Sequence, residues 1–84
     1  MVEKKIAQII EMIEMLGEDT TVPKNIRKAL TEAKERLKSK EDLSTRISAA
    51  IYTIEAVSED INIPMHARTQ IWAILSALES IKPQ

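Results

Sequence analysis

Hydrophobic residues recur along the chain at every third or fourth position, in four stretches separated by short polar breaks. Residues at this spacing lie on one face of an α-helix, so each stretch predicts an amphipathic helix. The predicted helices are Glu3–Leu16, a second that begins near Val22 and continues to Leu37, a third that begins near Asp42, and a fourth that follows Asn62 and ends at Pro83.

The polar breaks contain residues that commonly begin or end helices. Gly17 follows the first helix, and we expect it to adopt the left-handed backbone conformation that glycine reaches at little cost. Thr21 and Asn62 are the predicted N-caps of the second and fourth helices, because short polar side chains bond to exposed backbone N–H groups. We expect Pro23 and Pro64 in the first turns of those helices, where a missing N–H does no harm.

A second regularity is a repeat at an offset of 41 residues, which relates Pro23 to Pro64 and the hydrophobic positions of the first two helices to those of the last two. It predicts two similar helical hairpins, about residues 3–38 and 42–82, within a single domain spanning 1–84. Each hairpin has one apolar face, and packing the two faces together buries both. The predicted fold is therefore all-α: a four-helix bundle or compact array built from two similar helical hairpins.

Each hairpin also carries an acidic pair in its turn, Glu18–Asp19 in the first and Glu59–Asp60 in the second. Hydrolases use paired carboxylates. These pairs precede helix N-termini, however, where the helix dipole stabilises negative charge, and we interpret them as structural. Arg27 and Arg68 lie one turn into the following helices, and we expect them to reach the acids of their own hairpin or those of the other.

The fourth helix is apolar around more than one face, unlike the second. Three of its hydrophobic residues stand where the second helix has polar ones: Thr31 corresponds to Trp72, Lys34 to Leu75 and Lys40 to Ile81. A wide apolar surface is covered either by a neighbouring helix or by a partner chain, and the sequence leaves both open. The candidate interface consists of Arg68, Trp72, Leu75 and Ile81. Its expected partner is a second copy of the chain, in a homodimer, or another protein.

The second helix is strongly basic. The stretch Lys24–Lys40 contains seven basic and two acidic residues, a local charge of +5 in a chain of net charge −1. The functional hypothesis is contact with nucleic-acid phosphates. We favour a solvated face instead, with Glu32 and Arg36 paired and acidic helices as neighbours, because the helix has no aromatic residue for stacking on bases. The candidate nucleic-acid contacts are Lys24, Arg27 and Lys28.

Little in the 84 residues supports catalysis. The chain has no cysteine, which excludes disulfides and thiolate metal sites, and His66 is its single histidine. It has no glycine-rich phosphate loop and no nucleophile motif. We predict no catalytic residue, metal or cofactor, and a binding function rather than an enzyme. A weaker hypothesis is a pocket between the hairpins, recognisable as a polar cleft that holds Arg27, Arg68 and a carboxylate.

The expected location is the cytoplasm. No hydrophobic run approaches the ~18 residues that a membrane-spanning helix needs. The first residues are charged and lack the apolar core of a signal peptide. We therefore expect no contact with a membrane.

Two motifs carry a resemblance to a known family. They are TVPKNIRKA at Thr21–Ala29 and NIPMHARTQIW at Asn62–Trp72, the second being the more specific. They resemble uncharacterised archaeal protein family 0147, and the resemblance extends over nearly the whole chain. It implies a short helical protein of archaeal, cytosolic origin. It implies no activity, cofactor or catalytic residue.

Overall fold

The computed structural model describes residues 2–81, which form four helices and, within that range, no strand. The helices are α1 (Val2–Gly17), α2 (Lys24–Leu37), α3 (Leu43–Glu55) and α4 (Met65–Ile81). The predicted all-α fold of four helices is confirmed. Residue 82, at the predicted end of the second hairpin, and Pro83 lie outside the described residues.

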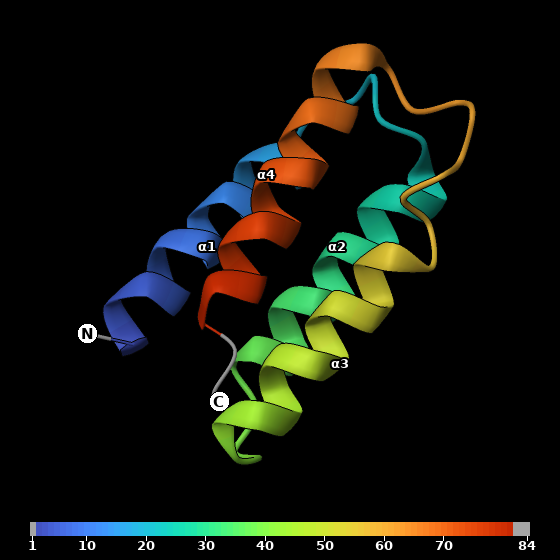
Figure 1. The fold of residues 1–84 in the computed structure, drawn as a ribbon. Helices are drawn as coiled ribbons and strands as arrows, with labels where there is room; N and C mark the ends of the chain where they lie inside the picture. The colour runs from blue at the N-terminus through green and yellow to red at the C-terminus, as the bar shows by residue number, and fades with distance from the viewer. Residues whose placement is uncertain (1, 82–84) are drawn as a thin grey trace.

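The helices form a closed ring of neighbours. Helix α1 packs against α2 and α4, and α3 packs against the same two helices. The diagonal helices α1 and α3 are joined by a surface ion pair between Glu3 Oε2 and Arg46 Nη2 at 3.2 Å. The α1–α2 and α3–α4 turns lie together at one end, and the α2–α3 connection lies at the other (Figure 1). Each hairpin is therefore sealed against the other through two separate helix pairs, α1 with α4 and α2 with α3.

The core repeats at the same offset as the sequence. Nine of the ten buried positions of the first hairpin have a counterpart 41 residues later that is buried or, at Val57, half-buried; the tenth, Ala29, corresponds to exposed Gln70. The nine are Ile6, Ile9, Ile13, Leu16, Val22, Ile26, Leu30, Ala33 and Leu37. Together with their counterparts they form one hydrophobic cluster to which all four helices contribute. The similarity of the two hairpins thus extends from their sequence to their packing.

The two hairpin turns are built by aspartates. Asp19 accepts a hydrogen bond from the Thr21 N–H through Oδ1 (2.9 Å), and Asp60 accepts one from the Asn62 N–H in the same way (2.8 Å). The backbone carbonyl of each aspartate also accepts from the N–H three residues later, at 3.1 and 3.2 Å. The second acid of each pair therefore folds its turn by bonding to local backbone.

Both predicted N-caps are wrong. Helix α2 begins after Pro23, which makes no side-chain cap, and α4 begins at Met65. Thr21 and Asn62 lie too early, because each is held inside a turn by its aspartate and the helix begins only after the following proline. The prolines stand one residue before their helices, and their carbonyls accept from the N–H of Arg27 (3.1 Å) and Arg68 (2.9 Å).

Gly17 also differs from its prediction: it is the last residue of α1, and its φ is not positive. The chain leaves α1 by tightening instead. The N–H groups of Glu18 and Asp19 donate to the carbonyls of Met15 (3.3 Å) and Leu16 (3.1 Å), which is right-handed geometry that needs no glycine. Helix α3 begins as expected, after Asp42, whose side chain accepts from the Thr45 N–H at 2.8 Å.

Candidate functional site

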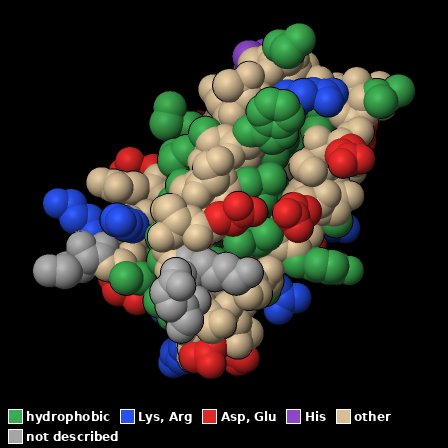
Figure 2. Space-filling model, in the orientation of Figure 1, with side chains coloured by type: hydrophobic (Ala, Val, Ile, Leu, Met, Phe, Trp, Pro, Cys, Tyr) green, Lys and Arg blue, Asp and Glu red, His purple; other side chains and the backbone are tan. Residues whose placement is uncertain are grey.

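The outer face of α4 carries an exposed tryptophan. Trp72 is 63% exposed, and Met65, two turns earlier, is 80% exposed. Leu75 is half-buried and packs against the core. Arg68 is half-buried as well, and its Nη2 donates to the Asp60 backbone carbonyl at 3.3 Å. Figure 2 shows hydrophobic side chains gathered along this face of α4.

Ile81 does not belong to this surface. It is 8% exposed and part of the core, so its assignment to the candidate interface is wrong. The reason is helical spacing: Ile81 follows Leu78 by three residues and lies on the same buried face. The chain itself covers Ile81 and most of Leu75, whereas it leaves Trp72 largely in solvent.

Thr31, the counterpart of Trp72 in the first hairpin, lines a polar hollow. A depression of about 340 Å³ between α1 and α2 is lined by Glu14, Thr31 and Lys34 among others. Lys34 Nζ and Glu14 Oε2 form an ion pair across it at 3.4 Å. In the second hairpin the corresponding residues of α4 are Trp72 and Leu75. One hairpin therefore has an apolar ridge where the other has a charged hollow.

The basic residues of α2 are not equivalent to one another. Lys24 and Lys28 are exposed, whereas Arg27 is half-buried and donates from Nε to the Val22 carbonyl at 3.1 Å. The predicted pairing of Glu32 with Arg36 is wrong, since no ion pair joins them among residues 2–81. Pairing with an acidic neighbouring helix is present, through Lys34 and Glu14.

At the end of the molecule that holds both turns, a pair of equivalent polar contacts joins the hairpins. His66 Nε2 lies 2.7 Å from Asp19 Oδ2, and Asn25 Nδ2 donates to Asp60 Oδ2 at 3.2 Å. The offset of 41 relates Asn25 to His66 and Asp19 to Asp60, so the two contacts are counterparts. We name this pair of contacts the reciprocal clasp: each hairpin's turn aspartate is bound by the first turn of the other hairpin's second helix.

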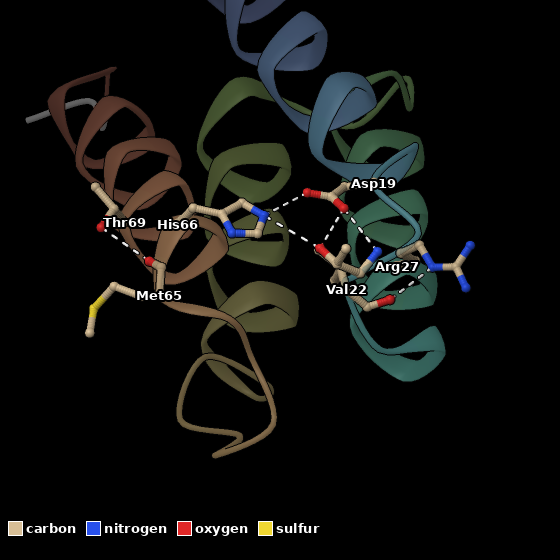
Figure 3. Close-up of polar contacts among 7 residues, drawn as sticks. Asp19, Val22, Arg27, Met65, His66 and Thr69 are labelled. Carbon is tan, nitrogen blue, oxygen red and sulfur yellow. Dashed lines mark hydrogen bonds and ion pairs between the residues drawn. The ribbon is translucent and has the colours of Figure 1, made fainter.

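The expectation that the arginines reach an acidic side chain is wrong. Arg27 and Arg68 each bond to a backbone carbonyl within their own hairpin, and shorter polar side chains make the crossing. Figure 3 shows the guanidinium end of Arg27 directed away from Asp19 and His66. The hypothesis of a polar cleft in which both arginines converge therefore finds no support in this arrangement. The feature of the sequence that could have indicated the clasp is the repeat itself. It relates Asn25 to His66 in the same way that it relates the two turn aspartates.

The local turns first, and then the clasp, lower the pKa of both aspartates. Hydrogen bonds from Thr21, and then from His66, lower the pKa of Asp19 from 3.8 to about 2. The Asn62 backbone N–H, and then Asn25, lower the pKa of Asp60. Both aspartates are therefore stabilised as anions.

The geometry of His66 is unlike that of a hydrolytic triad. In a triad the acid and the nucleophile bind opposite nitrogens of the imidazole. Here Asp19 lies next to Nε2, and the Thr21 hydroxyl lies 3.4 Å from the same nitrogen. That hydroxyl also lies 2.6 Å from Asp19 Oδ1, to which it donates (Figure 3). In residues 2–81 no group of three or more His, Asp or Glu side chains is placed to hold a metal ion.

A further feature that the sequence did not indicate is an apolar groove of about 180 Å³ between α1 and α4. Its lining consists of Met12, Met15, Gln70, Ala73 and Ile74. Met15 is 75% exposed at its edge. No helix in the described range has the length and apolar character to cross a membrane.

Known proteins resemble the chain over most of its length. A model of an uncharacterised protein family, UPF0147, matches residues 1–81. A UPF0147 protein of Pyrococcus horikoshii is 48% identical over 83 residues, which cover 96% of this chain and 89% of the relative. One from Archaeoglobus fulgidus is 38% identical over 81 residues, covering 96% and 93%. A structure titled as the crystal structure of the unknown function protein MMP1188 is 48% identical, with a TM-score of 0.89 and coverage of 94% and 91%.

Proposed function

Because the chain belongs to the uncharacterised protein family UPF0147, whose name assigns no activity, we propose a function from its own surface: a non-enzymatic protein-interaction scaffold that binds through α4. The contact surface centres on Trp72, with Arg68 and Leu75 beside it. Family membership agrees with the resemblance drawn from the two motifs.

The exposure of Trp72 carries the proposal. Tryptophan is among the residues most enriched at the energetic centres of protein interfaces, because it combines a large apolar surface with one hydrogen-bond donor. At 63% exposure it leaves much of that surface in water, although the counterpart position in the first hairpin holds a threonine. The same exposed position is thus polar in the first hairpin and a large aromatic residue in the second.

A binding role also accounts for the polar groups better than catalysis does. The one histidine is engaged with Asp19 in joining the hairpins, and among residues 2–81 no nucleophile is hydrogen-bonded to its opposite ring nitrogen. A cytoplasmic location remains the expectation that accompanies this proposal.

A photocrosslinking amino acid placed at position 72 tests the proposal in cells. The matched control places it at position 31, the counterpart on α2. We expect crosslinks to polypeptide from position 72 and none from position 31, unchanged by nuclease treatment of the extract. Equal yields from both positions, or none from position 72, would contradict an interaction surface on α4.

The second candidate is nucleic-acid binding through α2. Two observations favour it: Lys24 and Lys28 are exposed, and Tyr52 of α3, which is 77% exposed, lines a shallow hollow of about 480 Å³ together with Lys28. An aromatic ring beside basic side chains is a feature of single-strand binding surfaces.

Two other features of α2 oppose this candidate. Lys34 is paired with Glu14, and Arg27 is partly engaged with the Val22 carbonyl, so the basic surface is smaller than the sequence indicates. Crosslinks that disappear on nuclease treatment, together with crosslinks from position 31, would support nucleic-acid binding over the proposed function.

A further inference from the structure

The outer face of α4 carries a sequence of side chains with symmetric spacing. Arg68 precedes Trp72 by four residues, Trp72 precedes Leu75 by three, and Glu79 follows Leu75 by four. Steps of four, three and four keep all of them on one stripe of an α-helix. We call these four residues the α4 stripe. It has a positive charge at one end, a negative charge at the other, and two large hydrophobic residues between them.

The stripe is accessible in part. Trp72 and Glu79 are exposed, and Arg68 and Leu75 are half-buried. Arg68 uses Nη2 for the Asp60 carbonyl, which leaves its other N–H donors available, because a guanidinium carries five. Within residues 2–81, Glu79 takes part in no ion pair.

Two such stripes complement each other when they run antiparallel about a twofold axis. The midpoint of the stripe lies between Ala73 and Ile74, and Arg68 and Glu79 are equally far from it along the helix. A twofold axis through that midpoint brings each Arg68 opposite a Glu79 and each Trp72 opposite a Leu75. A closed twofold contact uses the same patch on both chains, and this patch meets that requirement.

We propose that the partner on α4 is a second copy of this chain, bound antiparallel along the α4 stripe. Each Trp72 then packs against the partner's Leu75, and each Arg68 pairs with the partner's Glu79. This inference rests on the proposed interaction surface and names its occupant. The symmetric placement of opposite charges supports a second copy over an unrelated protein, because an unrelated partner gives no reason for that symmetry.

The contact is modest in size. An interface of standard size covers about 800 Å² of each partner, roughly a seventh of the 5587 Å² surface of this chain. A stripe along one helix covers less. We therefore expect a dissociation constant on the order of micromolar to tens of micromolar, and a dimer that dissociates on dilution.

A charge-exchange experiment by analytical ultracentrifugation tests the register. We expect Arg68→Glu and Glu79→Arg each to be monomeric at concentrations where the unaltered chain is dimeric, because like charges then face each other at both ends. Mixed together, the two variants should form a heterodimer, since the glutamate introduced at position 68 then faces the arginine introduced at position 79. The other end of that heterodimer retains the original pair. Recovery of the dimer only on mixing is a result that loss of stability in either variant would not produce.

Circular dichroism of each variant serves as the folding control. If Arg68→Glu is unfolded through loss of its bond to Asp60, the Glu79→Arg variant alone decides, since Glu79 is exposed on the helix surface. An unaltered chain that sediments as a monomer at tens of micromolar, or a Glu79→Arg variant that dimerises like it, would overturn the inference. If position 72 still crosslinks to another polypeptide in cells, the interaction surface stands and only its occupant is wrong.

Discussion

His66 and Asp19, separated by 47 positions in the chain, approach to 2.7 Å between Nε2 and Oδ2. Asn25 and Asp60, their counterparts in the repeat, make the same crossing in the opposite direction at 3.2 Å. The two hairpins are thus joined reciprocally at the end where both turns lie (Figure 1). Although the surrounding surface is exposed, each turn is ordered by the other hairpin as well as by its own backbone.

The clasp predicts how His66 tolerates substitution. His66→Asn should preserve most of the melting temperature, because asparagine is the residue that makes the counterpart crossing to Asp60. His66→Ala should lower it measurably, since Asp19 then loses its partner across the hairpins. Thermal unfolding of the two variants at neutral pH checks this. Equal losses in both would show that His66 contributes by packing rather than by its hydrogen bond.

The lowered pKa of Asp19 predicts a dependence of stability on acid. A carboxyl whose pKa falls from 3.8 to about 2 on folding stabilises the folded state above about pH 4. That contribution is lost as the pH decreases through the folded-state value, because the carboxyl is then protonated in both states. Asp19→Asn should therefore melt at a lower temperature than the unaltered chain at neutral pH and at nearly the same temperature near pH 2. A gap independent of pH would contradict this.

Gly17 should be replaceable with a gain in stability. It is helical, its φ is not positive, and within residues 2–81 no atom beyond its chain neighbours and its own helix backbone lies within 4 Å of a Cβ added there. Gly17→Ala should raise the free energy of unfolding by about 0.4–1 kcal/mol, mainly by restricting the unfolded chain. Chemical denaturation measures the change. A loss of stability would show that the end of α1 needs the left-handed conformation expected from the sequence.

The core should respond strongly to loss of volume in the second hairpin. Ile74 is 0% exposed, and its counterpart Ala33 is buried too. Ile74→Ala would place an alanine at both positions and leave a cavity, at a cost of about 2–5 kcal/mol. Ile61→Ala is the matched control, because Ile61 is 88% exposed and its truncation should change stability by less than about 0.5 kcal/mol.

Binding of nucleic acid should be weak. The exposed Lys24 and Lys28 give α2 a small positive surface, but Lys34 is paired with Glu14 and α2 itself carries no aromatic side chain for stacking. We expect no binding of duplex or single-stranded nucleic acid tighter than about 1 μM at physiological salt. Tighter binding with a steep salt dependence, abolished by Lys24→Glu with Lys28→Glu, would instead locate a site on α2.

Local turn chemistry and the extent of the interface are harder to predict from this sequence than the helices. The residue types at Thr21, Asn62 and Gly17 are typical of helix caps, but none of the three caps a helix in the structure. The aspartate side chains bind the backbone N–H groups of Thr21 and Asn62 and hold both residues in the turns, and residue preferences alone do not say which polar side chain sets the local geometry. Because its counterpart in the first hairpin is Lys40, Ile81 is expected at the surface. The spacing of Ile81 from Leu78 nevertheless indicates the buried face.

The set of helices, their buried faces and the repeat can all be read from the order of residues along the chain. Equivalent core positions can be matched at an offset of 41, as for Ile13 with Ile54 and Leu37 with Leu78. This is possible because helical amphipathicity depends only on residues close together in the chain. Tertiary structure alone decided that His66 and Asn25, rather than the arginines, bind the opposing aspartates. It also decided that Trp72 lies in solvent while Ile81 is covered. Those outcomes depend on how two hairpins are placed against each other, and that placement follows from packing the whole core.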